Sequence, residues 1–137
     1  MKIVICASMS ACKKVMEIKE ELEGAGHKVI IPSGTEDYAN GSLPPESWKE
    51  SVANKIDGDL LRRYFNEIKE SDAILAVNID KNGVKNYIGG NTFLEMGFAH
   101  VLNKKVFLLN NIPGIGYKDE IIAIQPIILK GDLSKIS

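Results

Sequence analysis

A glycine pair, two small polar residues and a carboxylate follow one another closely between residues 87 and 99. The sequence there reads Tyr-Ile-Gly-Gly-Asn-Thr-Phe-Leu-Glu-Met-Gly-Phe-Ala. Gly89 and Gly90 let the backbone approach a ligand, because glycine has no Cβ. A helix that begins after such a turn presents unpaired N–H groups, which favour an anion or a sugar. We therefore expect Gly89, Gly90, Asn91 and Thr92 to contact a substrate.

Glu95 can have a structural role or a chemical one. Thr92 and Glu95 are three residues apart, which matches a capping box with Thr92 as N-cap and Glu95 bonding back to its N–H. Spacing alone favours the cap over catalysis, and the two roles are compatible.

The elements that hold this stretch are read from the hydrophobic pattern. β-rich apolar runs alternate with segments of helical periodicity, such as Val15, Ile18 and Leu22. This alternation predicts an α/β fold, a three-layer α/β/α sandwich of flavodoxin or Rossmann type. Its five-stranded parallel sheet is expected in the order 2-1-3-4-5. The expected strands are 3–7, 27–32, 73–78, 105–110 and 126–129, and the expected helices are 11–25, 55–71, from Thr92 to about 102, and 118–124.

The loop after the first strand carries Ser8, Met9 and Ser10. Ligands bind at the carboxyl edge of open α/β sheets, so these residues could hold a phosphate or a ribose. In the alternative, Ser10 is only the N-cap of the next helix. Residues 33–48 are expected to form a loop, in which Tyr38 and Trp48 could stack on a base or cover the core.

Composition narrows the class of protein. The chain has 137 residues, 45% of them hydrophobic, and a net charge of −1, which suits one globular domain spanning 1–137. Nothing in this balance points to nucleic acid or an anionic membrane, and no apolar run approaches a membrane span. Met1–Ile5 is typical of a strand rather than a signal peptide, so a cytoplasmic location is expected.

The sequence contains no pattern that indicates a cofactor or a metal. Its two cysteines, Cys6 and Cys12, give no disulfide framework, and Cys6 is expected to be a small core residue. There is no metal-ligand cluster, Walker loop or G-x-G-x-x-G motif.

Three segments resemble a known family. They are Cys6-Ala-Ser-Met9, Ser71-Asp-Ala-Ile-Leu75 and Asn91-Thr-x-x-Glu-Met-Gly-Phe-Ala99, the last followed by Lys104-Lys-Val-Phe107. Over nearly its whole length the chain resembles the nucleoside 2-deoxyribosyltransferase superfamily, including its 2-deoxynucleoside 5-monophosphate N-hydrolase branch. The Glu-x-Gly-x-Ala core with the following Lys-Lys-Val is the most specific part.

The resemblance implies that Glu95 is a nucleophile at C1 of a ribose or deoxyribose. The reaction would be cleavage or transfer of the N-glycosidic bond of a nucleoside or nucleoside 5-monophosphate, through a glycosyl-enzyme ester. Ser8 and the loop after it would hold sugar or phosphate. The resemblance also implies a homodimer or larger homo-oligomer whose subunits complete one another's pockets.

The chain departs from the family pattern at three positions. Gly89 stands where the family has an aspartate or, in the monophosphate hydrolases, a serine. Ser10 stands where the phosphate-using enzymes of the family often have an arginine, after the serine of the first loop. Tyr64 stands where the family has a catalytic aspartate, and it could donate a proton or clamp the substrate. Tyr64 also fits the apolar stripe of a helix.

Two other functions remain open. Gly89-Gly-Asn-Thr-x-x-Glu95 partly resembles the Gly-Gly-x-Gly-Thr-x-x-Glu loop of nucleotide phosphoribohydrolases that release cytokinins, although it is one residue shorter. The alternative class is a non-catalytic nucleotide-binding or sensing module on the same fold. The loss of the family's acidic residues at the positions of Gly89 and Tyr64 favours that module, whereas the presence of Glu95 favours an enzyme.

Overall fold

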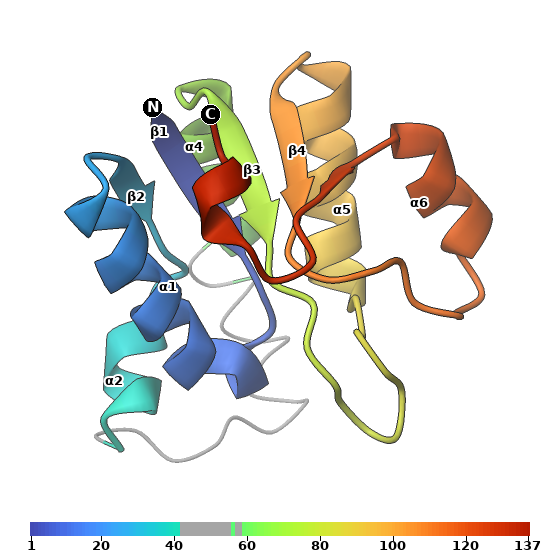
Figure 1. Cartoon of the computed structure of the whole chain (residues 1–137), viewed down its shortest axis with the longest axis horizontal. Helices are drawn as coiled ribbons and strands as arrows, with labels where there is room; N and C mark the ends of the chain where they lie inside the picture. The colour runs from blue at the N-terminus through green and yellow to red at the C-terminus, as the bar shows by residue number, and fades with distance from the viewer. Residues whose placement is uncertain (42–55, 57–58) are drawn as a thin grey trace.

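The computed structural model describes residues 1–41, 56 and 59–137, and its centre is a parallel sheet (Figure 1). The strands are β1 (Lys2–Cys6), β2 (Lys28–Ile30), β3 (Ala73–Ala76), β4 (Lys105–Leu108) and β5 (Ile127–Ile128). All four strand pairs are parallel, and the order is β2-β1-β3-β4-β5. The predicted strand order is confirmed.

Helices cover both faces of the sheet, so the predicted three-layer sandwich is also confirmed (Figure 1). One face is covered by α1 (Cys12–Gly24) and by the C-terminal 3-10 helix η2 (Leu133–Lys135), with α2 (Thr35–Ala39) packed beside α1. The other face is covered by α4 (Leu60–Lys69) and α5 (Gly90–Val101), with α6 (Lys118–Ile124) beside α5.

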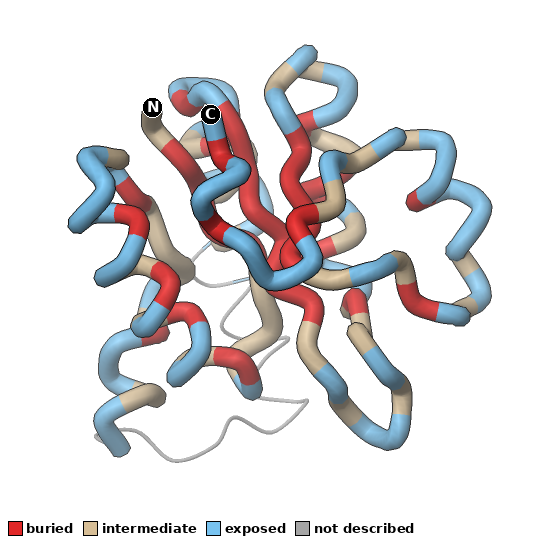
Figure 2. The backbone as a smooth tube through the Cα atoms, in the orientation of Figure 1, coloured by how far each residue is buried: buried red, intermediate tan, exposed pale blue. Residues whose placement is uncertain are grey.

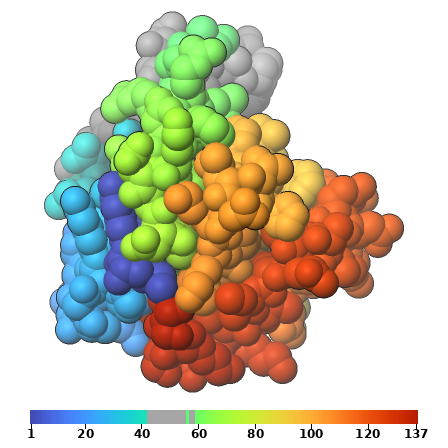
Figure 3. All heavy atoms as spheres, turned by 90° about the horizontal axis from the view of Figure 1, so that it is seen from above, coloured from blue at the N-terminus to red at the C-terminus, as the bar shows by residue number. Residues whose placement is uncertain are grey.

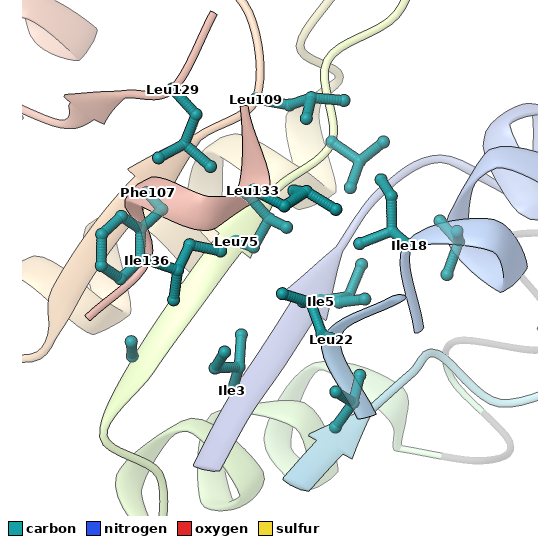
Figure 4. Packing of buried hydrophobic residues seen from close by; sticks show 14 of the residues in the cluster. Ile3, Ile5, Ile18, Leu22, Leu75, Phe107, Leu109, Leu129, Leu133 and Ile136 are labelled. Atoms are coloured by element: carbon teal, nitrogen blue, oxygen red, sulfur yellow. The ribbon is translucent and has the colours of Figure 1, made fainter. Parts of the chain in front are cut away.

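Each strand divides its side chains between two cores, because successive strand residues point to opposite faces. Ile3 and Ile5 of β1 pack toward α1 and the C-terminal segment, as Figure 4 shows with Leu22 and Ile136. Val4 and Cys6 belong instead to the core beneath α4 and α5. In Figure 2 the buried residues follow the strands and the inner sides of the helices.

The last residues complete the first core. Leu133 and Ile136 are buried there, and Lys105 Nζ donates to the carbonyl oxygen of Ser137 over 2.7 Å. Figure 3, which looks at the sheet from above Figure 1, shows this segment beside the first strand. Within the described ranges, no helix combines the length and the apolar character needed to cross a bilayer.

Several boundaries differ from the predictions. The strands are shorter than the apolar runs, and α4 begins at Leu60, while residues 55, 57 and 58 of the predicted helix lie outside the described part of the chain. A short helix, α2, occupies part of the predicted loop. Gly34 at φ 81° begins it, and Glu36 and Asp37 in its first turn complement the helix dipole. Tyr38 lies on α2, and Trp48 lies outside the described residues.

Candidate active site

The carboxyl edge of the sheet brings together the segments predicted to bind substrate. β1 runs downward in Figure 1 into the serine loop, and α5 begins at the same lower edge. Ser8 precedes the 3-10 helix η1 (Met9–Ala11), and its Oγ lies 2.7 Å from Ser10 Oγ. Ala11, not Ser10, is the N-cap of α1, so the alternative in which Ser10 is only that N-cap is wrong.

The predicted capping box is not formed. The N-cap of α5 is Gly89, with no side-chain cap hydrogen bond, and the Phe93 N–H donates to the Gly89 carbonyl over 2.9 Å. Thr92 is therefore the third helical residue, and Glu95 lies one turn further on. The residue before this N-cap, Ile88, is buried, and its carbonyl accepts a hydrogen bond from the Tyr117 hydroxyl.

Glu95 is buried, with 6% of its surface exposed. Burial raises the pKa of the Cys6 thiol well above its ordinary value, and the negative charge of Glu95 adds to the rise. Cys6 is a core residue, as predicted, and its thiol lies within reach of the charge of the candidate nucleophile. The period-two pattern of β1 places Cys6 on the face beneath α4 and α5, whereas the sequence gives no sign that Glu95 lies near it.

Tyr64 approaches the same point from α4. Its hydroxyl donates to the Ile5 carbonyl, one residue before Cys6. Burial raises the pKa of Tyr64 well above its ordinary value, and negative charge on Cys6, Glu95 and Glu67 adds to the rise. Phe65 and Phe98 meet edge to face at 5.3 Å and join α4 to α5. Three elements thus bring Cys6, Tyr64 and Glu95 together.

A polar clamp at the end of β3 holds the segment that leads to the glycine pair. Asn78 is fully buried; its Nδ2 donates to the Asn111 carbonyl at 2.9 Å, and its Oδ1 accepts from the Asn110 N–H at 2.8 Å. The Asn86 N–H donates to Asp80 at 2.9 Å. A buried amide whose hydrogen bonds are satisfied orders the loops it joins. Sequence inspection missed this residue, although an asparagine directly after an apolar strand is a visible signal.

The two glycines of the pair differ in their surroundings. A Cβ on Gly89 would lie 3.4 Å from the Tyr87 ring, whereas none of the described atoms lies within 4 Å of a Cβ placed on Gly90. Lys81 Nζ lies 5.7 Å from the centre of the Tyr87 ring. Gly89, Gly90, Asn91 and Thr92 thus form the first turn of α5 and its cap; Thr92 is buried and Asn91 exposed.

Among the described residues, no three histidine, cysteine, aspartate or glutamate side chains group as they would around a metal ion.

Comparison with known proteins supports the fold. The chain is similar to the CMP N-glycosidase BcmB of Clostridium botulinum, with 17% identity and a TM-score of 0.52 over 93% of this chain and 85% of that one. At this identity the likeness establishes a shared fold. No family model and no curated protein matches the chain.

Proposed function

We propose that this protein cleaves or transfers the N-glycosidic bond of a nucleoside or nucleoside 5-monophosphate, with Glu95 as the nucleophile. The observation that carries the proposal is the burial of Glu95 on α5, the helix that begins at the carboxyl edge of the parallel sheet. The shared fold with a CMP N-glycosidase supports the same chemistry.

The reaction proceeds by double displacement. A Glu95 carboxylate oxygen attacks C1 of the sugar, the C1–N bond breaks, and the base leaves with the bonding electrons and takes up a proton. Water, or a second base, then attacks C1 of the glycosyl ester and releases the carboxylate. Few water contacts surround a carboxylate buried to this degree, so little hydration has to be removed before attack.

Around Glu95 the proposed binding groups come from two loops. Ser8, Met9 and Ser10 hold the sugar or its phosphate, and the first turn of α5, from Gly89 to Thr92, supplies backbone N–H groups. Tyr64 completes the site. Since its hydroxyl already donates to the Ile5 carbonyl and its pKa is raised, it is better suited to fix the site than to protonate a leaving base.

The test is a substrate screen. The purified protein is incubated separately with ribo- and deoxyribonucleosides and their 5-monophosphates, CMP among them, and free base is measured by chromatography. We expect base release from at least one substrate and none with Glu95→Gln.

A non-catalytic nucleotide-binding module is the second candidate, favoured by Gly89 and Tyr64 at positions where the resembling family carries acids. It would replace the enzyme if calorimetry detects nucleotide binding while the screen detects no free base.

A further inference from the structure

Tyr117 contacts both ends of the first turn of α5. Its hydroxyl donates to the carbonyl of Ile88, directly before the N-cap. Its ring stacks on Phe93, with the ring centres 4.7 Å apart and the ring planes at 28°. Ile88 and Phe93 flank the four residues from Gly89 to Thr92, which the proposed function assigns to substrate binding. A single side chain from the loop after β4 therefore contacts this turn on either side.

Tyr117 is itself held in place by the fold. It is the N-cap of α6, where its carbonyl accepts from the Ile121 N–H at 3.2 Å, and Ile121 is fully buried. At the other end of the same loop, Asn110 Nδ2 donates to the Asn78 carbonyl at 2.9 Å, and the Asn110 N–H donates to the Asn78 side chain. The loop from Asn110 to Tyr117, which passes the start of α5 in Figure 1, is thus fixed at both ends. Tyr117 can therefore impose an orientation on the turn that it contacts.

The hydrogen bond from Tyr117 also sets the direction of a neighbouring N–H group. The described part of the chain has no cis peptide bond, so the carbonyl of Ile88 and the N–H of Gly89, which share one planar peptide, point in opposite directions. Because the carbonyl is directed at Tyr117, the Gly89 N–H is directed away from it. Among the described residues, no backbone carbonyl accepts a hydrogen bond from that N–H. A donor on the carbonyl polarises the peptide and makes its N–H a stronger donor.

We propose that Tyr117 is a positioning residue for substrate binding: its hydroxyl fixes the Ile88–Gly89 peptide so that the Gly89 N–H is presented to the bound sugar or its phosphate. This inference rests on the proposed function, which places the substrate at the first turn of α5. The hydrogen bond acts on binding rather than on cleavage, because Glu95 lies in the second turn, next to the fully buried Met96 that packs this part of the helix into the core.

The kinetic test removes the hydroxyl and the ring contact separately. It uses CMP or, if CMP releases no base, the nucleotide that releases most base in the substrate screen. Tyr117→Phe keeps the ring on Phe93 and should raise KM about 3- to 10-fold with kcat changed by less than about twofold, because a misdirected N–H weakens the ground state and the transition state alike. Phe93→Leu removes the stacked ring but keeps the bond to Ile88, so the urea midpoint should fall while KM stays within about twofold.

Three kinetic results would overturn the proposal. An unchanged KM in Tyr117→Phe would show that the hydroxyl does not affect binding. An equal rise in KM in Tyr117→Phe and Phe93→Leu would assign the effect to packing. A lower kcat at unchanged KM would place the effect on the nucleophile instead of the binding turn.

A second measurement needs no turnover. In protein whose glycines carry a heavy nitrogen isotope, the NMR signal of the Gly89 amide reports the hydrogen bond that the Ile88 carbonyl of the same peptide accepts. The signal is assigned as the one that Gly89→Ala removes. Tyr117→Phe should shift it in the absence of nucleotide, while the signal of Gly24 on α1 stays in place. An unshifted Gly89 signal would overturn the orienting role, whatever the activity.

The same signal separates this inference from the proposed function. The nucleotide of the kinetic test is added to labelled Glu95→Gln protein, which should bind it without turnover. If the Gly89 signal responds but the unmodified protein releases no base, the proposed cleavage is overturned and Tyr117 still positions a bound nucleotide. If base is released but the Gly89 signal does not respond, the inference is overturned and the proposed function stands. If neither occurs, both are overturned.

Discussion

Glu95 is the residue on which the proposed chemistry depends, and it lies in the second turn of α5. Glu95→Gln removes the charge but keeps a side chain of nearly the same size and a carbonyl oxygen that can accept hydrogen bonds. We expect unfolding free energy to change by about 1 kcal/mol or less. Base release should fall by more than about a thousandfold, because an amide is a poor nucleophile.

The comparison needs urea unfolding, base release and nucleotide affinity from the same preparation. Glu20→Gln, an exposed glutamate on α1, serves as the matched control and should behave like the unmodified protein. If Glu95→Gln retained full base release, Glu95 would not be the nucleophile.

Cys6 also makes stability depend on pH. Its pKa is raised on folding, so the folded state holds the thiol proton more tightly than the unfolded chain does. This stabilisation is complete below the unfolded thiol's pKa of roughly 8.5 and is lost as pH rises above it, at up to about 1.4 kcal/mol per pH unit. Between about pH 8.5 and 10 the unfolding free energy of Cys6→Ala should therefore fall less steeply with pH than that of the unmodified protein. Urea unfolding across that range checks this, and parallel slopes would contradict it.

Between elements, the Tyr64 hydroxyl ties α4 to β1. Tyr64→Phe leaves the Ile5 carbonyl without this donor in a buried place, which should cost about 1–3 kcal/mol. Because the bond lies one residue before Cys6, we also expect kcat to fall. Denaturant unfolding and steady-state kinetics measure the two effects. A variant with unchanged stability and kcat would show that the hydroxyl neither fixes the site nor acts in it.

Asn78 joins the ends of β3 and β4 to the loop before α5. Asn78→Ala removes both halves of the amide and leaves the Asn110 N–H without that acceptor, so we expect a loss of about 1–3 kcal/mol. Asn66→Ala, an exposed asparagine on α4, is the control and should change stability by about 0.5 kcal/mol or less. Chemical unfolding of both variants decides whether the clamp orders this edge; equal losses would show that it does not.

For the whole molecule, the homo-oligomer implied by the family resemblance stays a prediction. α5 exposes Leu94 (47%) and Val101 (73%), which are seven residues apart and so share one helix face. If that face joins subunits, Val101→Asp should lower the sedimenting mass. Ile122→Asp, at a similarly exposed apolar residue on α6, should leave it unchanged. A single monomeric species for the unmodified protein at micromolar concentration would contradict the prediction.

The sequence determined the architecture because apolar periodicity and chain connectivity are local signals. The run from Ile3 to Cys6 predicts a buried strand, the spacing of Val15, Ile18 and Leu22 predicts a helix, and their alternation along the chain led to the sheet order that the structure has. The sequence also singled out the serine loop, from its place after the first strand, and Glu95, whose role as nucleophile is implied by the family resemblance whereas spacing alone favoured a cap.

Only the tertiary structure decided what surrounds Glu95. Residue spacing suggested a cap with Thr92, its neighbour along the chain, but the N-cap of α5 is Gly89. Cys6, from a strand far away in the sequence, and Tyr64, from a third element, lie within reach of the Glu95 charge. Contacts of this kind depend on how a helix packs on a sheet, and one-dimensional spacing contains no information about packing distance or rotation.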